Sequence, residues 1–249
     1  MDVQTSRRPI RVAVWSTGGI GSISITAVGR REDLELVGVW VHSDEKVGRD
    51  AGELANGRPI GLKATNDVDA LLALDPDCVS YNPIWFDVDE VCRFLAAGVD
   101  VATTSEFITG RHLGPERLDR LRAAALAGGA TLFGSGVNPG FANLFGLVTA
   151  GICERVDRIT VLESVDASGY ASAETQLGVG FAGDPDDPET AAKAQRASAV
   201  FGDAVALMGD RYVALVESDR PECPDRFLIL VPLNADGNGI IGDRPVRRR

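Results

Sequence analysis

Apolar residues between positions 11 and 133 fall into short runs rich in valine and leucine, separated by stretches that carry one apolar face. Short β-branched runs are typical of buried strands, and the stretches between them are typical of helices that cover a sheet. Strands are predicted over 12–16, 36–41, 78–82, 99–104 and 130–133. Their alternation with helical patterns indicates βαβ units, so we expect an α/β fold with a doubly wound, mostly parallel sheet.

Glycine and small polar residues mark where the helices of this region begin and end. Helices are predicted over 68–74, 87–97 and 115–127. Gly98 and Gly128 directly follow the last two, at the position where glycine commonly ends a helix. Before the first helix, either Asn66 or Asp67 is available to accept hydrogen bonds from the first turn.

The pattern changes after Phe141, where the regular alternation of strand and helix ends. The predicted elements of this second region are a helix over 144–153, a strand over 157–165, an amphipathic helix over 187–210 and a strand over 227–231. We therefore expect a first domain over 1–141, a second, smaller and incomplete α+β domain over 142–210, and a tail over 211–249.

Composition narrows the class of function. A net charge of -11 argues against nucleic acid or an anionic membrane as a partner, because both require clustered cations. The two histidines and four cysteines are widely separated, so no metal site is expected. No apolar run is long enough for a membrane helix, and the first residues lack a secretory pattern. We expect a cytoplasmic protein.

A glycine-rich turn carries the strongest functional signal. It directly follows the first predicted strand and directly precedes an apolar helix, and it reads Ser16-Thr17-Gly18-Gly19-Ile20-Gly21. Such a turn lets the backbone approach a pyrophosphate and directs the positive end of the helix at it, as in the Rossmann fold. The first glycine of the usual template is replaced by Ser16. A dinucleotide site is predicted here, and the alternative is an ordinary tight turn.

The end of the second strand indicates which dinucleotide is bound. His42 and Ser43 stand where an acidic residue would select NAD, while Lys46 and Arg49 could pair with the additional phosphate of NADP. NADP is therefore favoured over NAD, although Asp44 lies nearby in the sequence. The alternative is that these residues form a solvated loop.

Four segments resemble a known family of oxidoreductases. They are residues 34–43, 46–54, 81–83 and 136–141. The chain resembles the dihydrodipicolinate-reductase-like NAD(P)-dependent oxidoreductases, and most closely the group of 2,4-diaminopentanoate dehydrogenases and native amine dehydrogenases. The resemblance covers most of the chain between residues 11 and 210. It implies a cofactor domain followed by a substrate domain, a small-molecule amine or carbonyl substrate, and a homodimer.

The resemblance also implies roles for individual residues. Asn82, Pro83, Thr104 and Asn138 would bind the cofactor, the first three at its nicotinamide end and Asn138 from the crossover between the domains. Glu106 matches a glutamate thought to transfer protons on the incoming amine. Reductive amination requires a group that deprotonates ammonia and later protonates the leaving hydroxyl, and one carboxylate can do both. The alternative for Glu106 is a solvated or helix-capping carboxylate.

The second region would supply the substrate contacts. By resemblance these are Phe141, Ser168 and Tyr170, with the alternative that Tyr170 is only a half-buried aromatic residue. Family members continue for about another hundred residues, as expected for two domains of ordinary length. Beyond residue 210 this chain matches nothing in the family, so part of the substrate domain would be missing.

Three functions remain open from the sequence. The first is an NAD(P)-dependent dehydrogenase that transfers hydride to an imine formed from a carbonyl and ammonia. The second is a reductase of another C=N or C=O substrate on the same architecture, although no cationic cluster suited to a dicarboxylate is found. The third is a dinucleotide-binding remnant without catalytic activity, which the unmatched tail favours.

Overall fold

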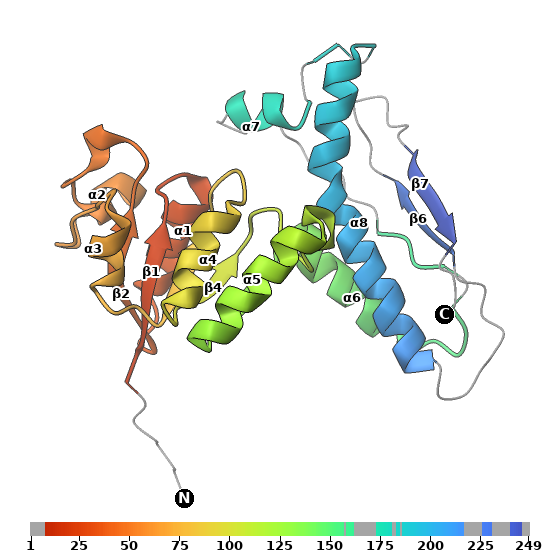
Figure 1. The fold of residues 1–249 in the computed structure, drawn as a ribbon, viewed down its shortest axis with the longest axis horizontal. Helices are drawn as coiled ribbons and strands as arrows, with labels where there is room; N and C mark the ends of the chain where they lie inside the picture. Colours follow the sequence, from red (N-terminus) through yellow and green to blue (C-terminus); the bar gives the residue numbers. More distant parts are fainter. Residues whose placement is uncertain are drawn as a thin grey trace, which may run out of the picture. The chain divides into compact units, whose positions relative to one another are not determined.

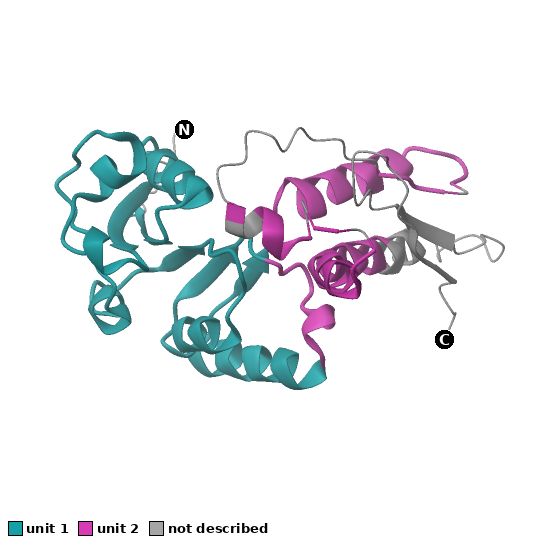
Figure 2. Cartoon of the chain, turned by 90° about the horizontal axis from the view of Figure 1, so that it is seen from above, with its two compact units in different colours: residues 1–105, 115–134 teal, residues 106–114, 135–249 magenta. Residues whose placement is uncertain are grey.

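The computed structural model describes residues 8–156, 158–161, 173–180, 183–184, 186–216, 226–230 and 240–245. The chain forms two compact units, which Figure 2 colours separately. Unit 1 consists of residues 1–105 and 115–134, and unit 2 consists of residues 106–114 and 135–249. The packing therefore changes near residue 134, and the segment 106–114 groups with the second unit although it lies within the first part of the sequence.

Unit 1 contains a parallel sheet of five strands, ordered β2-β1-β3-β4-β5. The strands are β1 (Ile10–Trp15), β2 (Leu34–Trp40), β3 (Cys78–Tyr81), β4 (Asp100–Thr103) and β5 (Leu132–Gly134). Each agrees with a predicted strand to within two residues at either end. The prediction of a Rossmann-type sheet is confirmed.

Helices cover both faces of this sheet (Figure 1). They are α1 (Gly19–Val28), α2 (Ala51–Asn56), α3 (Val68–Leu72), α4 (Val88–Ala96) and α5 (Pro115–Gly128). Val14 of β1 packs in one apolar cluster with Ile25 of α1, whereas the next residue, Trp15, contacts the ring of Phe94 on α4. Because successive side chains of a strand point to opposite faces, α1 and α4 lie on opposite sides of the sheet.

The helices of unit 1 begin and end at capping residues that can be recognised in the sequence. The capping residues of one helix, α2, were not used in the prediction. Asp67 rather than Asn66 caps α3, because its carboxylate accepts hydrogen bonds from two first-turn amides. Helix α2 was not predicted, although Asp50 caps its first turn and Gly57 ends it with a φ of 78°. The helix is short and its apolar face is narrow, so its hydrophobic pattern alone is weak.

Aromatic side chains fill the part of the core that faces α4. Trp15 and Trp40 stack with ring centroids 3.9 Å apart and an interplanar angle of 3°. Tyr81 and Phe94 pack against Trp15 at 5.5 and 5.2 Å. Trp15, Tyr81 and Phe94 are fully buried, so the ends of β1, β2 and β3 are fixed relative to α4 by a large contact area.

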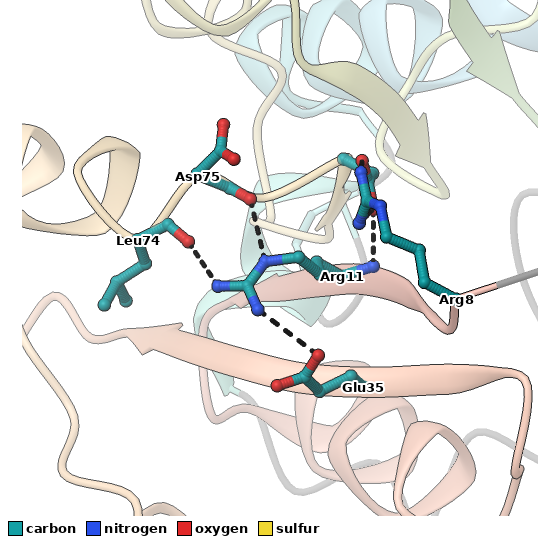
Figure 3. A network of polar contacts seen from close by, with 6 residues as sticks. Arg8, Arg11, Glu35, Leu74 and Asp75 are labelled. Atoms are coloured by element: carbon teal, nitrogen blue, oxygen red, sulfur yellow. Dashed lines mark hydrogen bonds and ion pairs between the residues drawn. The ribbon is translucent and has the colours of Figure 1, made fainter.

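The amino ends of β1 and β3 are joined by charged side chains (Figure 3). The Arg8 guanidinium donates two hydrogen bonds to Asp77, at 2.8 and 2.6 Å, and the backbone N–H of Arg11 donates to the same carboxylate at 2.8 Å. The Arg11 guanidinium donates to the carbonyl oxygens of Leu74 and Asp75 and pairs with Glu35. Charged groups at this edge thus bind one another.

Unit 2 is mainly helical in its described residues. Its regular elements are α6 (Ala142–Ala150), α7 (Ala173–Gly178), α8 (Pro188–Val216) and an antiparallel pair of strands, β6 (Arg226–Leu230) and β7 (Ile240–Pro245). Helix α8 packs against α6 and also against residues Arg111–Leu113, which form a turn of 3-10 helix. None of the helices in the described ranges is long and apolar enough to cross a membrane.

Three predictions for the second region need correction. Helix α8 does not end at residue 210 but continues to Val216, so the boundary of the tail cuts through a helix. Residues 158–161 have no regular secondary structure, although a strand was predicted over 157–165; the other residues of that range lie outside the described part of the chain. Helix α6 begins at Ala142 and ends at Ala150, earlier than the predicted 144–153, because Gly151 follows as its C-cap.

Candidate functional site

The glycine turn joins β1 to α1 at the carboxyl edge of the sheet. Ser16 begins the turn with a φ of 88°, in the left-handed region that favours glycine. Its backbone N–H donates to the carbonyl of Trp40 at 2.9 Å, and its hydroxyl donates to the carbonyl of Asn82 at 3.4 Å. Serine thus adopts the backbone conformation that the missing template glycine would have, held by contacts to both neighbouring strands.

The glycines of the turn serve two different purposes. A Cβ atom on Gly21 would lie 2.1 Å from the carbonyl oxygen of Ser16, so only glycine lets α1 pack this closely against the turn. A Cβ atom on Gly18 or Gly19 would meet no protein atom within 4 Å. Gly18 is the N-cap of α1 and offers no side-chain acceptor to the first-turn amides. This leaves open space at the positive end of a helix, an arrangement suited to an anion.

Uncharged polar side chains from α1, β3 and β4 meet beside this turn. The Asn82 side-chain amide donates to Ser80 Oγ at 2.8 Å and to Ser24 Oγ at 3.4 Å. Its carbonyl oxygen accepts from the hydroxyl of Thr104 at 2.9 Å. The hydroxyl of Ser105 donates to the carbonyl of Pro83. The structure therefore brings together Asn82, Pro83 and Thr104, three of the residues predicted to line the cofactor.

Sequence reasoning did not identify Ser24 and Ser80 as members of this cluster. Ser80 also donates to Ser24 Oγ at 3.3 Å, which links α1 to β3 at the polar edge. A serine in an apolar helix and a serine in a buried strand are weak signals when each is considered alone. Their spacing in the sequence carries no information about their contact, which depends on the order of strands in the sheet.

The end of β2 supplies the positive charge of this region. Lys46 lies in a turn of 3-10 helix, Asp44–Lys46, and its ammonium group donates to Thr17 Oγ1 at 3.4 Å. Asp44 Oδ1 accepts a hydrogen bond from the Asn66 amide at 2.8 Å, so this carboxylate already has a partner in the protein. His42 and Arg49 are exposed, and Ser43 is half-buried.

An acidic residue on α4 lies near the same strand ends. The hydroxyl of Tyr81 donates to Glu90 Oε2 at 2.5 Å. Burial raises the pKa of Glu90, although the hydrogen bond from Tyr81 and the charge of His42 act in the opposite direction. Burial also raises the pKa of Tyr81, and its hydrogen bond to Glu90 acts in the same direction.

The remaining predicted residues belong to unit 2. Glu106 directly follows Ser105 and has a φ of 32°, and it interacts with other residues of the protein. Asn138 and Phe141 lie in the irregular turn Val137–Phe141, where the Phe141 side chain is 64% exposed. Ser168 and Tyr170 fall outside the described residues. No group of three or more metal-ligating side chains is found within the described part of the chain.

The comparisons with known proteins agree with the architecture of unit 1. The chain is 35% identical over 189 residues to an amine dehydrogenase of Streptomyces virginiae, a match covering 72% of this chain and 52% of that protein. It is 36% identical over 106 residues to a 4-hydroxy-tetrahydrodipicolinate reductase of Synechococcus elongatus, covering 36% of each chain. No family model matches.

A solved structure of an amine dehydrogenase from Mycobacterium smegmatis superposes with a TM-score of 0.55 and 28% identity, covering 60% of this chain and 46% of that one. The chain spans about half the length of the amine dehydrogenases it matches. The sequence and fold comparisons lead to the same group that the four sequence segments indicated. The chain is therefore similar, over most of its length, to an amine dehydrogenase and, over a shorter stretch, to a 4-hydroxy-tetrahydrodipicolinate reductase.

Proposed function

We propose that this protein binds a nicotinamide dinucleotide at the carboxyl edge of the unit 1 sheet and uses it to reduce an imine formed from a carbonyl compound and ammonia. The observation that carries the proposal is the open space at Gly18 and Gly19, beside the uncapped first turn of α1. The relationship to amine dehydrogenases supports the choice of reaction.

The residues at this edge fit a dinucleotide. A pyrophosphate would occupy the space that a Cβ on Gly18 would fill, where first-turn amides can donate to it. Thr17 and Lys46 lie beside this space and add a hydroxyl and a positive charge. Asn82, Pro83 and Thr104 follow β3 and β4 and would contact the nicotinamide half, since ligands of open α/β sheets bind beyond the carboxyl ends of the strands.

NADP is the proposed dinucleotide. No carboxylate stands at His42 or Ser43, and the nearest one, Asp44, is held by Asn66. Lys46 and Arg49 supply two positive charges that a 2′-phosphate could pair with.

Glu106 is the proposed catalytic residue. The chain connects it directly to Ser105, whose hydroxyl is bonded to Pro83, so its backbone lies one residue from the polar edge. Its carboxylate would accept a proton from ammonia and return one to the leaving hydroxyl of the carbinolamine. The dinucleotide, when bound, supplies the hydride. Phe141, Ser168 and Tyr170 are proposed to shape the substrate side, and Asn138 is proposed to contact the dinucleotide.

The relationship to 4-hydroxy-tetrahydrodipicolinate reductase supports a second candidate function, the reduction of a C=N substrate that needs no added ammonia. Oxidation of NADPH with a panel of ketones separates these possibilities. Consumption that requires ammonia supports the first function, and consumption of a preformed imine without ammonia supports the second. Binding of NADPH without any turnover would identify a dinucleotide-binding protein that lacks catalytic activity.

Calorimetric titration with NADPH tests the binding site itself. Gly18→Val should abolish binding while the protein remains folded, because its side chain occupies only the space proposed for the pyrophosphate. Gly29→Val is the matched control, since it lies at the opposite, exposed end of the same helix. If a folded Gly18→Val protein binds NADPH as the wild type does, the proposed phosphate site is wrong.

A further inference from the structure

A buried carboxylate in unit 2 binds two side chains from one short segment. Asp203 of α8 is 5% exposed. Its Oδ2 atom lies 2.9 Å from Nδ1 of His112 and accepts a hydrogen bond from the hydroxyl of Thr109 at 3.0 Å. Both partners belong to the segment 106–114, which connects β4 to α5 and begins with Glu106.

The hydrogen bonds of Asp203 to His112 and Thr109 matter for stability because the carboxylate is buried. Burial by itself would raise the pKa of Asp203, but the hydrogen bonds from His112 and Thr109 more than compensate, and the pKa is lowered. Asp203 therefore remains ionised although it is buried. A buried charge is tolerated only where polar groups satisfy it, so the helix and the segment hold each other in place.

The segment has a backbone that requires such an anchor. Glu106, Gly110 and Gly114 have φ values of 32°, 73° and 86°, all in the left-handed region. Glycine adopts this region freely, but a glutamate there carries a strain that the surroundings must balance. The side chain of Phe107 is buried, and Thr109 and His112 are fixed on Asp203. The orientation of the Glu106 backbone thus depends on the burial of Phe107 and on the hydrogen bonds of Thr109 and His112 to Asp203.

We propose that Asp203, through His112 and Thr109, is a positioning residue that fixes the segment 106–114 and thereby aims the carboxylate of Glu106 at the substrate. This inference rests on the proposed function, in which Glu106 transfers the protons. In this role Asp203, His112 and Thr109 act through Glu106 and need no contact with the substrate or the dinucleotide. Their loss changes the geometry of the reaction, not the affinity for NADPH, whose proposed contacts lie mainly in unit 1.

Hydrogen exchange and steady-state kinetics on the whole chain together test this inference. Asp203→Ala should accelerate amide exchange over 106–114, where the N–H groups of Leu113 and Gly114 are hydrogen-bonded within the segment. Exchange in β1 and α1 should be unchanged. In the ammonia-dependent assay kcat should fall by about 100-fold, the effect of a misplacement near 1 Å, with the KM for NADPH unchanged.

A graded set of variants separates positioning from loss of folding. Asp203→Asn keeps the shape and one acceptor and serves if Asp203→Ala does not fold. His112→Asn keeps an N–H donor near the position of Nδ1 and should retain much more kcat than His112→Ala. Lys193→Ala, on the same helix but distant from Asp203 and paired with Glu189 at the surface, is the control that should leave both readouts unchanged.

The possible results separate the positioning role of Asp203 from the proposed function. Faster exchange confined to 106–114 together with a loss of kcat supports the inference. Unchanged exchange in both Asp203 variants, or faster exchange with unchanged kcat, overturns it. If the wild type binds NADPH but shows no ammonia-dependent turnover, the proposed function is wrong, and the positioning role of Asp203 is wrong with it. The wild-type assay alone identifies this result.

Discussion

The two edges of the unit 1 sheet are built from the same strands, yet they differ in the charge of their polar side chains and in the space left beside them. At the amino edge, Asp77 accepts hydrogen bonds from the Arg8 guanidinium and the Arg11 backbone N–H, and the Arg11 guanidinium donates to nearby backbone carbonyls. At the carboxyl edge the side chains are mostly uncharged, and space remains beside Gly18. The hydrogen-bonded charged groups of the amino edge stabilise the fold. The first-turn amides of α1 and the space beside Gly18 at the carboxyl edge are available to a ligand.

The largest expected effect is at Glu106, the residue that follows Ser105 in the chain. Glu106→Gln should preserve shape and affinity for NADPH but remove the proton transfer, which typically contributes a rate factor of about 100 to 10,000. Turnover in the ketone and ammonia assay measures this. Asp77→Asn at the amino edge is the control and should keep the turnover of the folded protein. Full activity in Glu106→Gln would mean that another group transfers the protons.

A smaller effect is expected for the choice between the two dinucleotides. Arg49→Ala should weaken NADPH binding by roughly 10-fold, the contribution of one charge-assisted hydrogen bond, and leave NADH binding unchanged. Arg58→Ala, another exposed arginine of unit 1, provides the comparison. A preference for NADH that persists in Arg49→Ala would show that Asp44 leaves Asn66 and turns toward the ribose.

The smallest expected effect is a change in stability caused by a substitution of Asp77 at the amino edge. The hydrogen bonds from Arg8 and then from the Arg11 backbone lower the pKa of Asp77 below its ordinary value. Because the pKa is lower in the folded state, this stabilisation is present above the unfolded pKa of about 3.9 and disappears as the pH falls through the folded value.

Asp77→Asn should therefore lower the free energy of unfolding by about 1 kcal/mol at neutral pH, as for a partly exposed ion pair with an added hydrogen bond. The difference from the wild type should shrink below pH ~4. Urea unfolding at neutral and acidic pH measures it. A difference that is constant across this range would contradict the assignment of the effect to ionised Asp77.

The fold of unit 1 was predictable because its signals are local. Strand β3 is a short apolar run, and Gly128 is the last residue of α5, where a stop was expected. Asp50 and Gly57 bound α2 by equally local signals that were not used. The predicted end of α8 at residue 210 was wrong because Gly209 and Asp210 interrupt the apolar pattern without ending the helix.

The contacts of the site were only partly predictable. The glycine turn is contiguous in the sequence, so its position could be found from residues 16–21 alone. The bond between Thr104 and Asn82 follows once two parallel strands are placed side by side. The bond between His112 and Asp203 joins residues 91 positions apart, on a loop and a helix whose packing no local pattern specifies.

Ser16 shows what the glycine template encodes. Its φ of 88° is the conformation that the turn needs at its first position, and glycine is common there because it adopts that conformation without strain. Serine can occupy the position when bonds to Trp40 and Asn82 offset the strain, which for one residue is of order 1–3 kcal/mol. A search that requires the letter G would pass over this chain, whereas a search for the backbone angle would find it. Turns of this kind are better catalogued by dihedral angle than by residue type.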